Sequence, residues 1–171
     1  VLTLVEPHAS GIGGGALMLH WDAAARRLSA WDGREVAPAA ATPDLFLRPD
    51  GTPMGFHEAA VGGRAVGVPG ALRMLEAAHR EHGRLPWARL FAPAVALAEE
   101  GFAVSPRLAA VIANEAERLG RDPAARAIYL LPDGSPLPVG HRLRSPALAA
   151  TLRAVAEGGA DALHRGPVAA A

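Results

Sequence analysis

The sequence predicts an α+β fold that is mostly helical and has a few β-strands near the N-terminus. Three observations support this prediction. Apolar runs of strand-like composition are confined to residues 1–38, proline and glycine dominate residues 38–69, and apolar residues recur at helical spacing from residue 70 onward. With 171 residues, half of them hydrophobic, the chain has the size of one globular domain.

The N-terminal part contains three candidate strands, at residues 1–5, 16–21 and 28–31. The second and third are separated by a polar connection, which indicates a β-hairpin. Two or three short strands rarely bury enough surface to be stable alone. We therefore expect strands 1–5 and 16–21 to pair with segments outside this chain or to remain as exposed edges.

The C-terminal part, residues 70–171, is expected to be helical. Ser105-Pro106 and Ser145-Pro146 each combine an N-cap residue with a first-turn proline, and glycines mark helix ends. A turn is expected at residues 132–135. These signals predict helices near residues 70–83, 86–101, 105–119 and 145–158, with short helical turns in 160–171.

Composition excludes several classes of function. The 17 basic residues are all arginine and balance 17 acidic residues, so the chain lacks the positive charge that nucleic-acid binding demands. Without cysteine or lysine it has no disulfide, thiolate nucleophile, Schiff base or phosphate-loop lysine. No apolar run approaches the roughly 20 residues of a membrane-spanning helix. His8, His20 and Glu6 do not have metal-ligand spacing, and we expect neither a metal nor a cofactor.

A glycine cluster at residues 11–15 is the densest local signal. It suits an anion-binding nest, a tight chain crossing or the rim of a substrate site. A dinucleotide-binding loop is not supported, because the cluster leads into a strand where that motif needs a helix. We expect Gly13 and Gly14 to adopt conformations that valine cannot.

Arg34 is the candidate binding residue. It follows a probable strand, and its planar guanidinium suits a carboxylate held by two parallel hydrogen bonds. The competing interpretation is a surface ion pair with Asp32 or Glu35. Ser10 lacks the sequence context of a hydrolase nucleophile, so we expect no catalytic residue in this chain.

Two motifs carry a family resemblance. Residues 6–15 (Glu-Pro-His-Ala-Ser-Gly-Ile-Gly-Gly-Gly) and 32–42 (Asp-Gly-Arg-Glu-Val-Ala-Pro-Ala-Ala-Ala-Thr) strongly resemble the large subunit of γ-glutamyltransferase, also called γ-glutamyl transpeptidase. Residues 67–70 and 90–102 continue the match. The resemblance implies a fragment of a four-layer αββα sandwich of the N-terminal nucleophile hydrolase superfamily, matured by self-cleavage.

The resemblance also implies an activity. In the family, an N-terminal threonine of the small subunit attacks a γ-glutamyl amide such as glutathione, and the acyl group passes to water or an amino acid. The arginine at the position of Arg34 would hold the substrate α-carboxylate. The sequence is also compatible with a glutaryl-cephalosporin acylase, a poly-γ-glutamate-processing relative or a catalytically silent scaffold.

We interpret residues 1–171 as a partial large-subunit segment, with strands and a glycine loop at 1–38 and a helical region at 70–171. The segment is expected to begin after the family's N-terminal helical part and to end before the threonine. Its partners would be the γ-glutamyl substrate and the small subunit, and alone it would be inactive. A signal peptide upstream would place the protein in the periplasm or outside the cell; otherwise it would be cytoplasmic.

Overall fold

The computed structural model describes residues 1–170, at Pro167 without the side chain. The chain divides into two compact units. One unit is Ile12–Ala78, and the other combines Val1–Gly11 with the chain from His79 onward. The boundary between the units falls inside helix α3 (Ala71–His82).

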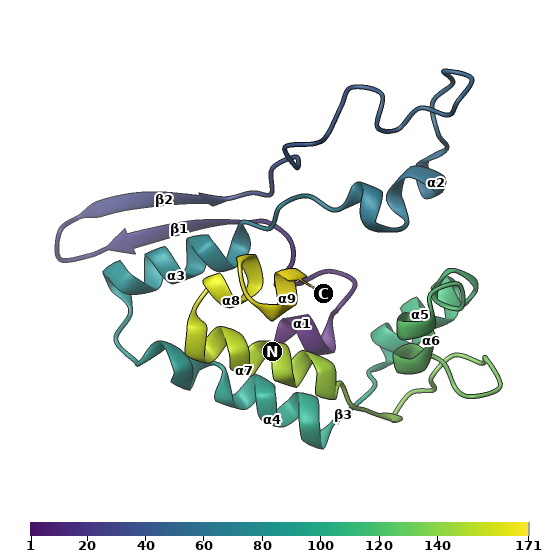
Figure 1. Ribbon diagram of the computed structural model, residues 1–171. Coiled ribbons are helices and arrows are strands. Elements are labelled where there is room, and N and C mark those ends of the chain that lie inside the picture. Colours follow the sequence, from purple (N-terminus) through teal and green to yellow (C-terminus); the bar gives the residue numbers. More distant parts are fainter. Residues whose placement is uncertain (171) are drawn as a thin grey trace. The chain divides into compact units, whose positions relative to one another are not determined.

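An antiparallel β-hairpin forms the first part of the unit Ile12–Ala78 (Figure 1). β1 (Ala16–Asp22) pairs with β2 (Arg27–Gly33) over the full length of both strands. In the connection, the Asp22 carboxylate accepts a hydrogen bond from the backbone N–H of Ala25 at 2.9 Å. The hairpin predicted from the polar connection is confirmed.

One face of this hairpin is apolar and exposed. Strand residues alternate between the two faces, and in β1 every second side chain is exposed. Leu17, Leu19, Trp21 and Leu28 are between 57% and 74% exposed. Within residues 1–170, β1 and β2 form a two-stranded sheet whose outer edges pair with no third strand. This agrees with the expectation of an exposed edge for the strand at residues 16–21.

Irregular backbone follows the hairpin, as the prolines and glycines of residues 38–69 predict. It is interrupted by α2 (Phe56–Ala60) and by the short 3-10 helix η1 (Gly63–Ala65). Arg48 and Glu58 form an ion pair of 2.6 Å that ties the loop to α2. Regular structure resumes at α3.

The other unit is helical apart from two short strands. Its elements are α1 (Leu2–Val5), η2 (Trp87–Leu90), α4 (Ala92–Glu100), β3 (Phe102–Ala103), α5 (Pro106–Leu119), α6 (Pro123–Tyr129), β4 (Arg142–Leu143), α7 (Pro146–Gly158), α8 (Asp161–His164) and α9 (Pro167–Ala170). β3 pairs with β4 in the antiparallel sense. The described chain is therefore a mostly helical α+β structure, as predicted.

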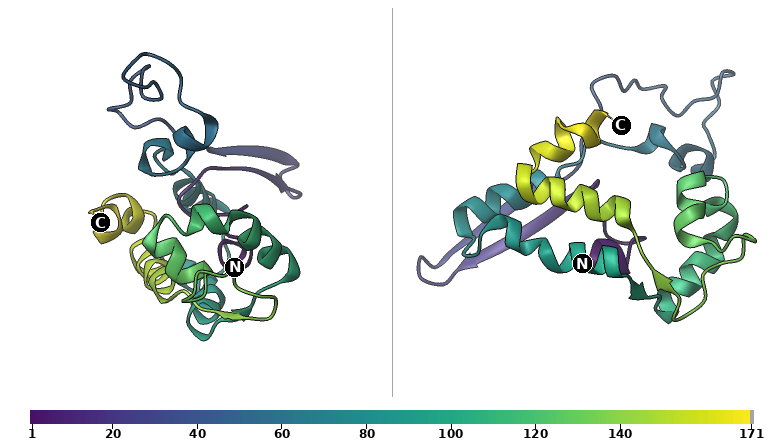
Figure 2. Two further views of the ribbon diagram at one scale, coloured as in Figure 1. Left: turned by 90° about the vertical axis from the view of Figure 1, so that its right-hand side faces the viewer. Right: turned by 60° about the horizontal axis from the view of Figure 1, so that its bottom comes forward.

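Helices α4 and α7 pack side by side (Figure 1 and Figure 2). Both helices have fully buried side chains, Ala98 in α4 and Ala149 and Val155 in α7. Small residues allow two helices to approach closely. The indole N–H of Trp87 in η2 donates to the carbonyl of Val155 at 3.0 Å, which fixes η2 against α7.

A second apolar cluster surrounds α5. Leu108 and Ile112 of this helix are 1% and 2% exposed. They pack with buried residues of the flanking segments, Val104, Leu130, Leu137 and Leu143.

The strand predicted at residues 1–5 is wrong, because this segment forms the short helix α1. The N–H groups of Leu4 and Val5 donate to the carbonyl of Val1 at 2.9 and 3.3 Å. Leu4 is buried, and α1 packs against α4. A short apolar run has no periodicity that separates strand from helix, so its tertiary contacts decide.

Two further predictions need correction. The helix expected over 86–101 is divided into η2 and α4, with Phe91 between them. Helix α6 is not among the predicted helices, although Asp122-Pro123 is a start signal of the same kind as Ser105-Pro106. The Asp122 carboxylate accepts a hydrogen bond from the N–H of Ala125 at 2.7 Å, as an N-cap does.

The two predicted serine caps differ in the structure. The hydroxyl of Ser105 accepts a hydrogen bond from the N–H of Leu108 at 3.1 Å, whereas Ser145 makes no capping hydrogen bond with its side chain. We expect Ser105→Ala to lower the free energy of unfolding of the full-length protein by about 1 kcal/mol. Ser145→Ala should cost clearly less. Urea unfolding of both variants tests this, and equal losses would contradict the assignment of the cap.

Candidate functional site

Arg34 directly follows β2 and lies in a turn fixed by Asp32. The backbone N–H of Arg34 donates to the Asp32 carboxylate at 2.8 Å. Aspartate is favoured in turns because its side chain reaches the backbone two residues ahead. The Arg34 side chain is exposed, and within residues 1–170 its guanidinium pairs with neither Asp32 nor Glu35. The donor fork is therefore available to a ligand.

The segment after Arg34 pairs with the turn at residues 67–70. Val36 donates its N–H to the carbonyl of Val68 at 3.3 Å, and Val68 returns a hydrogen bond to the carbonyl of Val36 at 2.8 Å. This isolated β-bridge joins two segments that are about thirty positions apart in the sequence. It holds the turn beside Arg34.

The glycine cluster also contacts the turn at residues 67–70, so that three backbone segments cross at this point. The carbonyl of Gly14 accepts hydrogen bonds from the N–H groups of Gly70 and Ala71 at 3.2 and 3.1 Å. The first N–H groups of a helix have no partner within the helix, and here Gly14 supplies one for the start of α3. Residues 12–15, 32–36 and 67–70 of three sequence motifs thus meet in one unit.

Glycine makes this crossing possible. A Cβ atom on Gly15 would lie 2.8 Å from the backbone nitrogen of Glu35 and 3.0 Å from the Cα of Arg34. A Cβ atom on Gly70 would overlap the carbonyl oxygen of Gly33 and lie 2.7 Å from that of Arg34. The backbone around Arg34 is therefore enclosed from two directions by glycine.

Two more glycines complete the enclosure. A Cβ atom on Gly33 would lie 2.5 Å from the Cβ of Met74 in α3, so Gly33 lets the end of β2 contact this helix. A Cβ atom on Gly67 would lie 3.1 Å from the Cγ of Glu35, which is tight but less severe. The tight chain crossing is thus the interpretation of the glycine cluster that the structure supports.

The expectation for Gly13 and Gly14 is wrong. A Cβ atom on either residue would meet nothing within 4 Å, and neither has a positive φ. Gly15 is the restricted member of the cluster, because it alone faces the backbone of Arg34 and Glu35. The amino-acid sequence shows the density of glycine but not which glycine faces the crossing.

The other motif residues lie in the second unit and form an ion-pair cluster. The Glu6 carboxylate contacts Nε2 of His8 at 3.2 Å and Nε of Arg107 at 3.0 Å. Ser10 donates its backbone N–H to the carbonyl of Glu6 at 3.1 Å, and in the described residues its hydroxyl makes no hydrogen bond to His8. This arrangement is not that of an activated serine.

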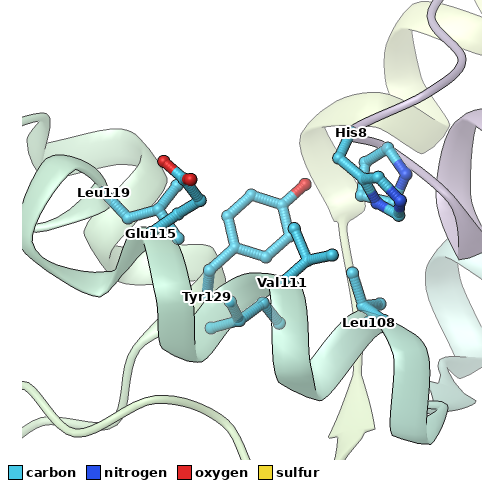
Figure 3. Close-up of a pocket in the computed structure, with 8 residues that line it drawn as sticks. His8, Leu108, Val111, Glu115, Leu119 and Tyr129 are labelled. Carbon is cyan, nitrogen blue, oxygen red and sulfur yellow. The ribbon is translucent and has the colours of Figure 1, made fainter.

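A pocket of about 170 Å³ opens in the same unit (Figure 3). The ring of Tyr129 lies between Glu115 and Val111, with its hydroxyl directed away from α5. Burial raises the pKa of Tyr129, which keeps the phenol neutral. Glu115 pairs with Arg118, His8 pairs with Glu6, and the other lining residues are apolar. The pocket presents no nucleophile and suits packing better than chemistry.

Neither a metal site nor a membrane span stands out. Among residues 1–170, no three histidine or carboxylate side chains gather so that they could bind a metal ion. None of the helices in the described chain combines the length and apolar character needed to cross a bilayer.

Comparison with known proteins identifies the family. The family model for gamma-glutamyltranspeptidase matches residues 1–171. The chain belongs to the γ-glutamyltranspeptidase family, whose fold is of the N-terminal nucleophile hydrolase type. The resemblance of the two N-terminal motifs to this family is confirmed.

Three relatives illustrate the match. A glutathione hydrolase proenzyme of Bacillus subtilis (strain 168) is 41% identical over 165 residues, which are 96% of this chain and 28% of the relative. An acylase ACY 1 proenzyme of Pseudomonas sp. (strain V22) is 40% identical over 170 residues, covering 96% of this chain and 30% of the relative.

The third relative is a solved structure. The γ-glutamyltranspeptidase of Helicobacter pylori superimposes with a TM-score of 0.91 at 30% identity, covering 99% of this chain and 48% of that one. The chain thus spans less than a third of the two relatives compared by sequence and about half of the solved chain.

The sequence points to Arg34 but not to the residues that hold it. Asp32 is expected from the sequence only as an ion-pair partner, whereas in the structure it fixes the Arg34 backbone. Gly15, Gly67 and Gly70 enclose the segment. The signal that points to Asp32 is its position two residues before Arg34, which is the spacing of an aspartate turn.

The restricted glycine defines a test of the crossing. Gly15→Val should reduce the yield of folded full-length protein, because overpacking typically costs about 1–3 kcal/mol and here the contacts are with backbone. Gly14→Val, which places the same side chain in open space, is the matched control and should be tolerated. Thermal unfolding and soluble yield report the difference. Equal behaviour of the two variants would show that the crossing does not depend on Gly15.

Proposed function

We propose that this chain is part of a γ-glutamyltransferase or glutathione hydrolase in which Arg34 binds the α-carboxylate of the γ-glutamyl group. The observation that carries the proposal is the Arg34 side chain, which is exposed and unpaired within residues 1–170 while its backbone is tightly enclosed. A fixed backbone and an available guanidinium are what recognition of a carboxylate requires.

The chemistry of Arg34 suits this role. A guanidinium donates two parallel N–H groups to the two oxygens of a carboxylate, which fixes orientation as well as charge. Holding the α-carboxylate at one end of the glutamyl group would fix the direction of the γ-carbonyl at the other end. Correct orientation of a reacting group is itself a large part of catalysis.

The reacting groups would lie outside this chain. An N-terminal threonine of the small subunit would attack the γ-carbonyl with its hydroxyl, while its own α-amine takes the proton. The amide C–N bond then breaks and the leaving amine takes up that proton, after which the glutamyl ester passes its acyl group to water or to an amino acid. The proenzyme names of the relatives support maturation of a precursor into subunits.

An acylase is the second candidate, and the 40% identity to an acylase proenzyme favours it over a catalytically silent scaffold. A glutaryl group carries the same terminal carboxylate as a γ-glutamyl group and lacks only the α-amine. Arg34 would bind both. The choice between the two activities therefore depends on the recognition of the amine.

The decisive experiment concerns Arg34 in the full-length enzyme. Arg34→Ala should lower kcat/KM for a γ-glutamyl anilide by roughly 30-fold to several thousand-fold, because losing a charge-assisted pair that the bound substrate partly buries costs about 2–5 kcal/mol. Arg34→Lys should not restore the activity, since an ammonium lacks the two-bond fork. Self-cleavage should continue in both variants, because it involves no substrate.

Two further substrates serve as controls. A 4-aminobutanoyl anilide lacks the α-carboxylate, so Arg34→Ala should change its turnover little. A glutaryl anilide retains the carboxylate, and a parent enzyme that prefers it would be an acylase. Loss of self-cleavage in Arg34→Ala would instead give Arg34 a structural role.

The full-length protein also tests for a silent scaffold. We expect the precursor to cleave itself into two chains, visible by gel electrophoresis, and to hydrolyse the γ-glutamyl anilide only after cleavage. Residues 1–171 alone should be inactive, since the proposed nucleophile is not among them. A precursor that stays intact and inactive would favour the catalytically silent homologue.

A further inference from the structure

The glycine contacts converge on the backbone of one residue. On one side Gly15 faces the Cα of Arg34, and on the other Gly70 faces its carbonyl oxygen. The N–H group of Arg34 is held by Asp32 at 2.8 Å. The main chain of Arg34 therefore has close neighbours at its nitrogen, its Cα and its carbonyl oxygen.

We propose that Gly15 is a positioning residue for substrate binding, because the absence of its side chain sets where Arg34 holds its guanidinium. The inference rests on the proposed role of Arg34 in binding the α-carboxylate. Gly67 and Gly70 act in the same way where the turn at residues 67–70 contacts this segment. None of these glycines needs to touch the substrate.

A methyl group at position 15 would act through the backbone. The Glu35 carboxylate, which lies against Gly15, can rotate away because it ends a flexible side chain. The nitrogen of Glu35, 2.8 Å from the added Cβ, can move only with the peptide that joins it to Arg34. The Cα of Arg34 would therefore shift, and the shift would be carried to the end of the side chain.

Such a shift matters for a two-bond contact. Both N–H groups of the guanidinium must align with both oxygens of the carboxylate. A misplacement of about 1 Å in a positioned group can cost 10²-fold in rate. Within residues 1–170 the guanidinium has no ion-pair partner, so no other side chain would hold it in place if its backbone moved.

The test uses Gly15→Ala in the full-length enzyme, with Gly13→Ala as the matched control. Both variants add one methyl group to the same cluster, but the methyl at position 13 meets nothing within 4 Å. Gly15→Ala should lower kcat/KM for the γ-glutamyl anilide by about 10-fold to 100-fold. Turnover of the 4-aminobutanoyl anilide, which offers no α-carboxylate, should change by less than a factor of about two, and Gly13→Ala should match the parent.

A double variant separates positioning from a general structural effect. If Gly15 acts through Arg34, Gly15→Ala should cost little further activity in the Arg34→Ala background, because coupled residues are not additive. The inference would be overturned if Gly15→Ala lowered kcat/KM as much in the Arg34→Ala background as in the parent. It would also be overturned if Gly15→Ala lowered the turnover of both substrates equally. If Arg34→Ala itself matches the parent, the proposed function fails, which is a different result.

A milder variant covers the case in which Gly15→Ala does not fold. Gly67→Ala places a methyl 3.1 Å from both the Cγ of Glu35 and the carbonyl oxygen of Val36, so its neighbours must move only slightly. It should show the same discrimination between the two substrates with a smaller loss, about 3-fold, as expected for a smaller displacement. The inference would be overturned if a folded, self-cleaved Gly67→Ala enzyme had the same ratio of activities on the two substrates as the parent.

Discussion

The close crossing of three backbone segments is the constraint on which the unit Ile12–Ala78 depends. At this point the end of β2 passes between the glycine cluster and the turn before α3, at distances that no Cβ atom would permit. Backbone hydrogen bonds from Val36 to Val68 and from Gly70 to Gly14 hold the three segments together. The buried side chains of this unit include Leu72 and Met74 of α3, whereas the hairpin exposes Leu17, Leu19 and Trp21. The crossing therefore combines two tasks, since it joins the hairpin to α3 and it fixes the backbone of Arg34.

Much of the fold was predictable because its signals are local. The polar connection between two strand-like runs predicted the hairpin, and serine-proline pairs marked the starts of α5 and α7. The failure at the N-terminus arises where local signals are too weak and a long-range contact decides. Residues 1–5 are too short for periodicity to distinguish a helix from a strand, so the contact of α1 with α4 decides. Helix α6 begins at Asp122-Pro123, an N-cap residue followed by proline as at the starts of α5 and α7, so its beginning can be recognised in the sequence.

The sequence identified the candidate binding residue of the site, but it did not predict which residues contact its backbone. The resemblance of two motifs to a family was sufficient to select Arg34, and the chemistry of guanidinium agrees with that choice. The sequence could not show which glycine is restricted. Gly13, Gly14 and Gly15 are identical in type and adjacent, yet only the last faces the backbone of Arg34. That distinction depends on a segment some twenty positions away in the sequence, which spacing alone does not place.

The backbone of Arg34 is enclosed whereas its side chain is exposed, and this difference has a practical consequence for protein engineering. The glycine and aspartate contacts act on main-chain atoms, and the side chain is exposed and unpaired in the described residues. Position 34 can therefore accept many amino acids without repacking its surroundings. Under the proposed role of Arg34, a saturation library at this single codon would sample acyl-donor selectivity while leaving the scaffold intact. Libraries that include Gly15 or Gly70 would instead contain many clones in which a bulky side chain disrupts the backbone crossing.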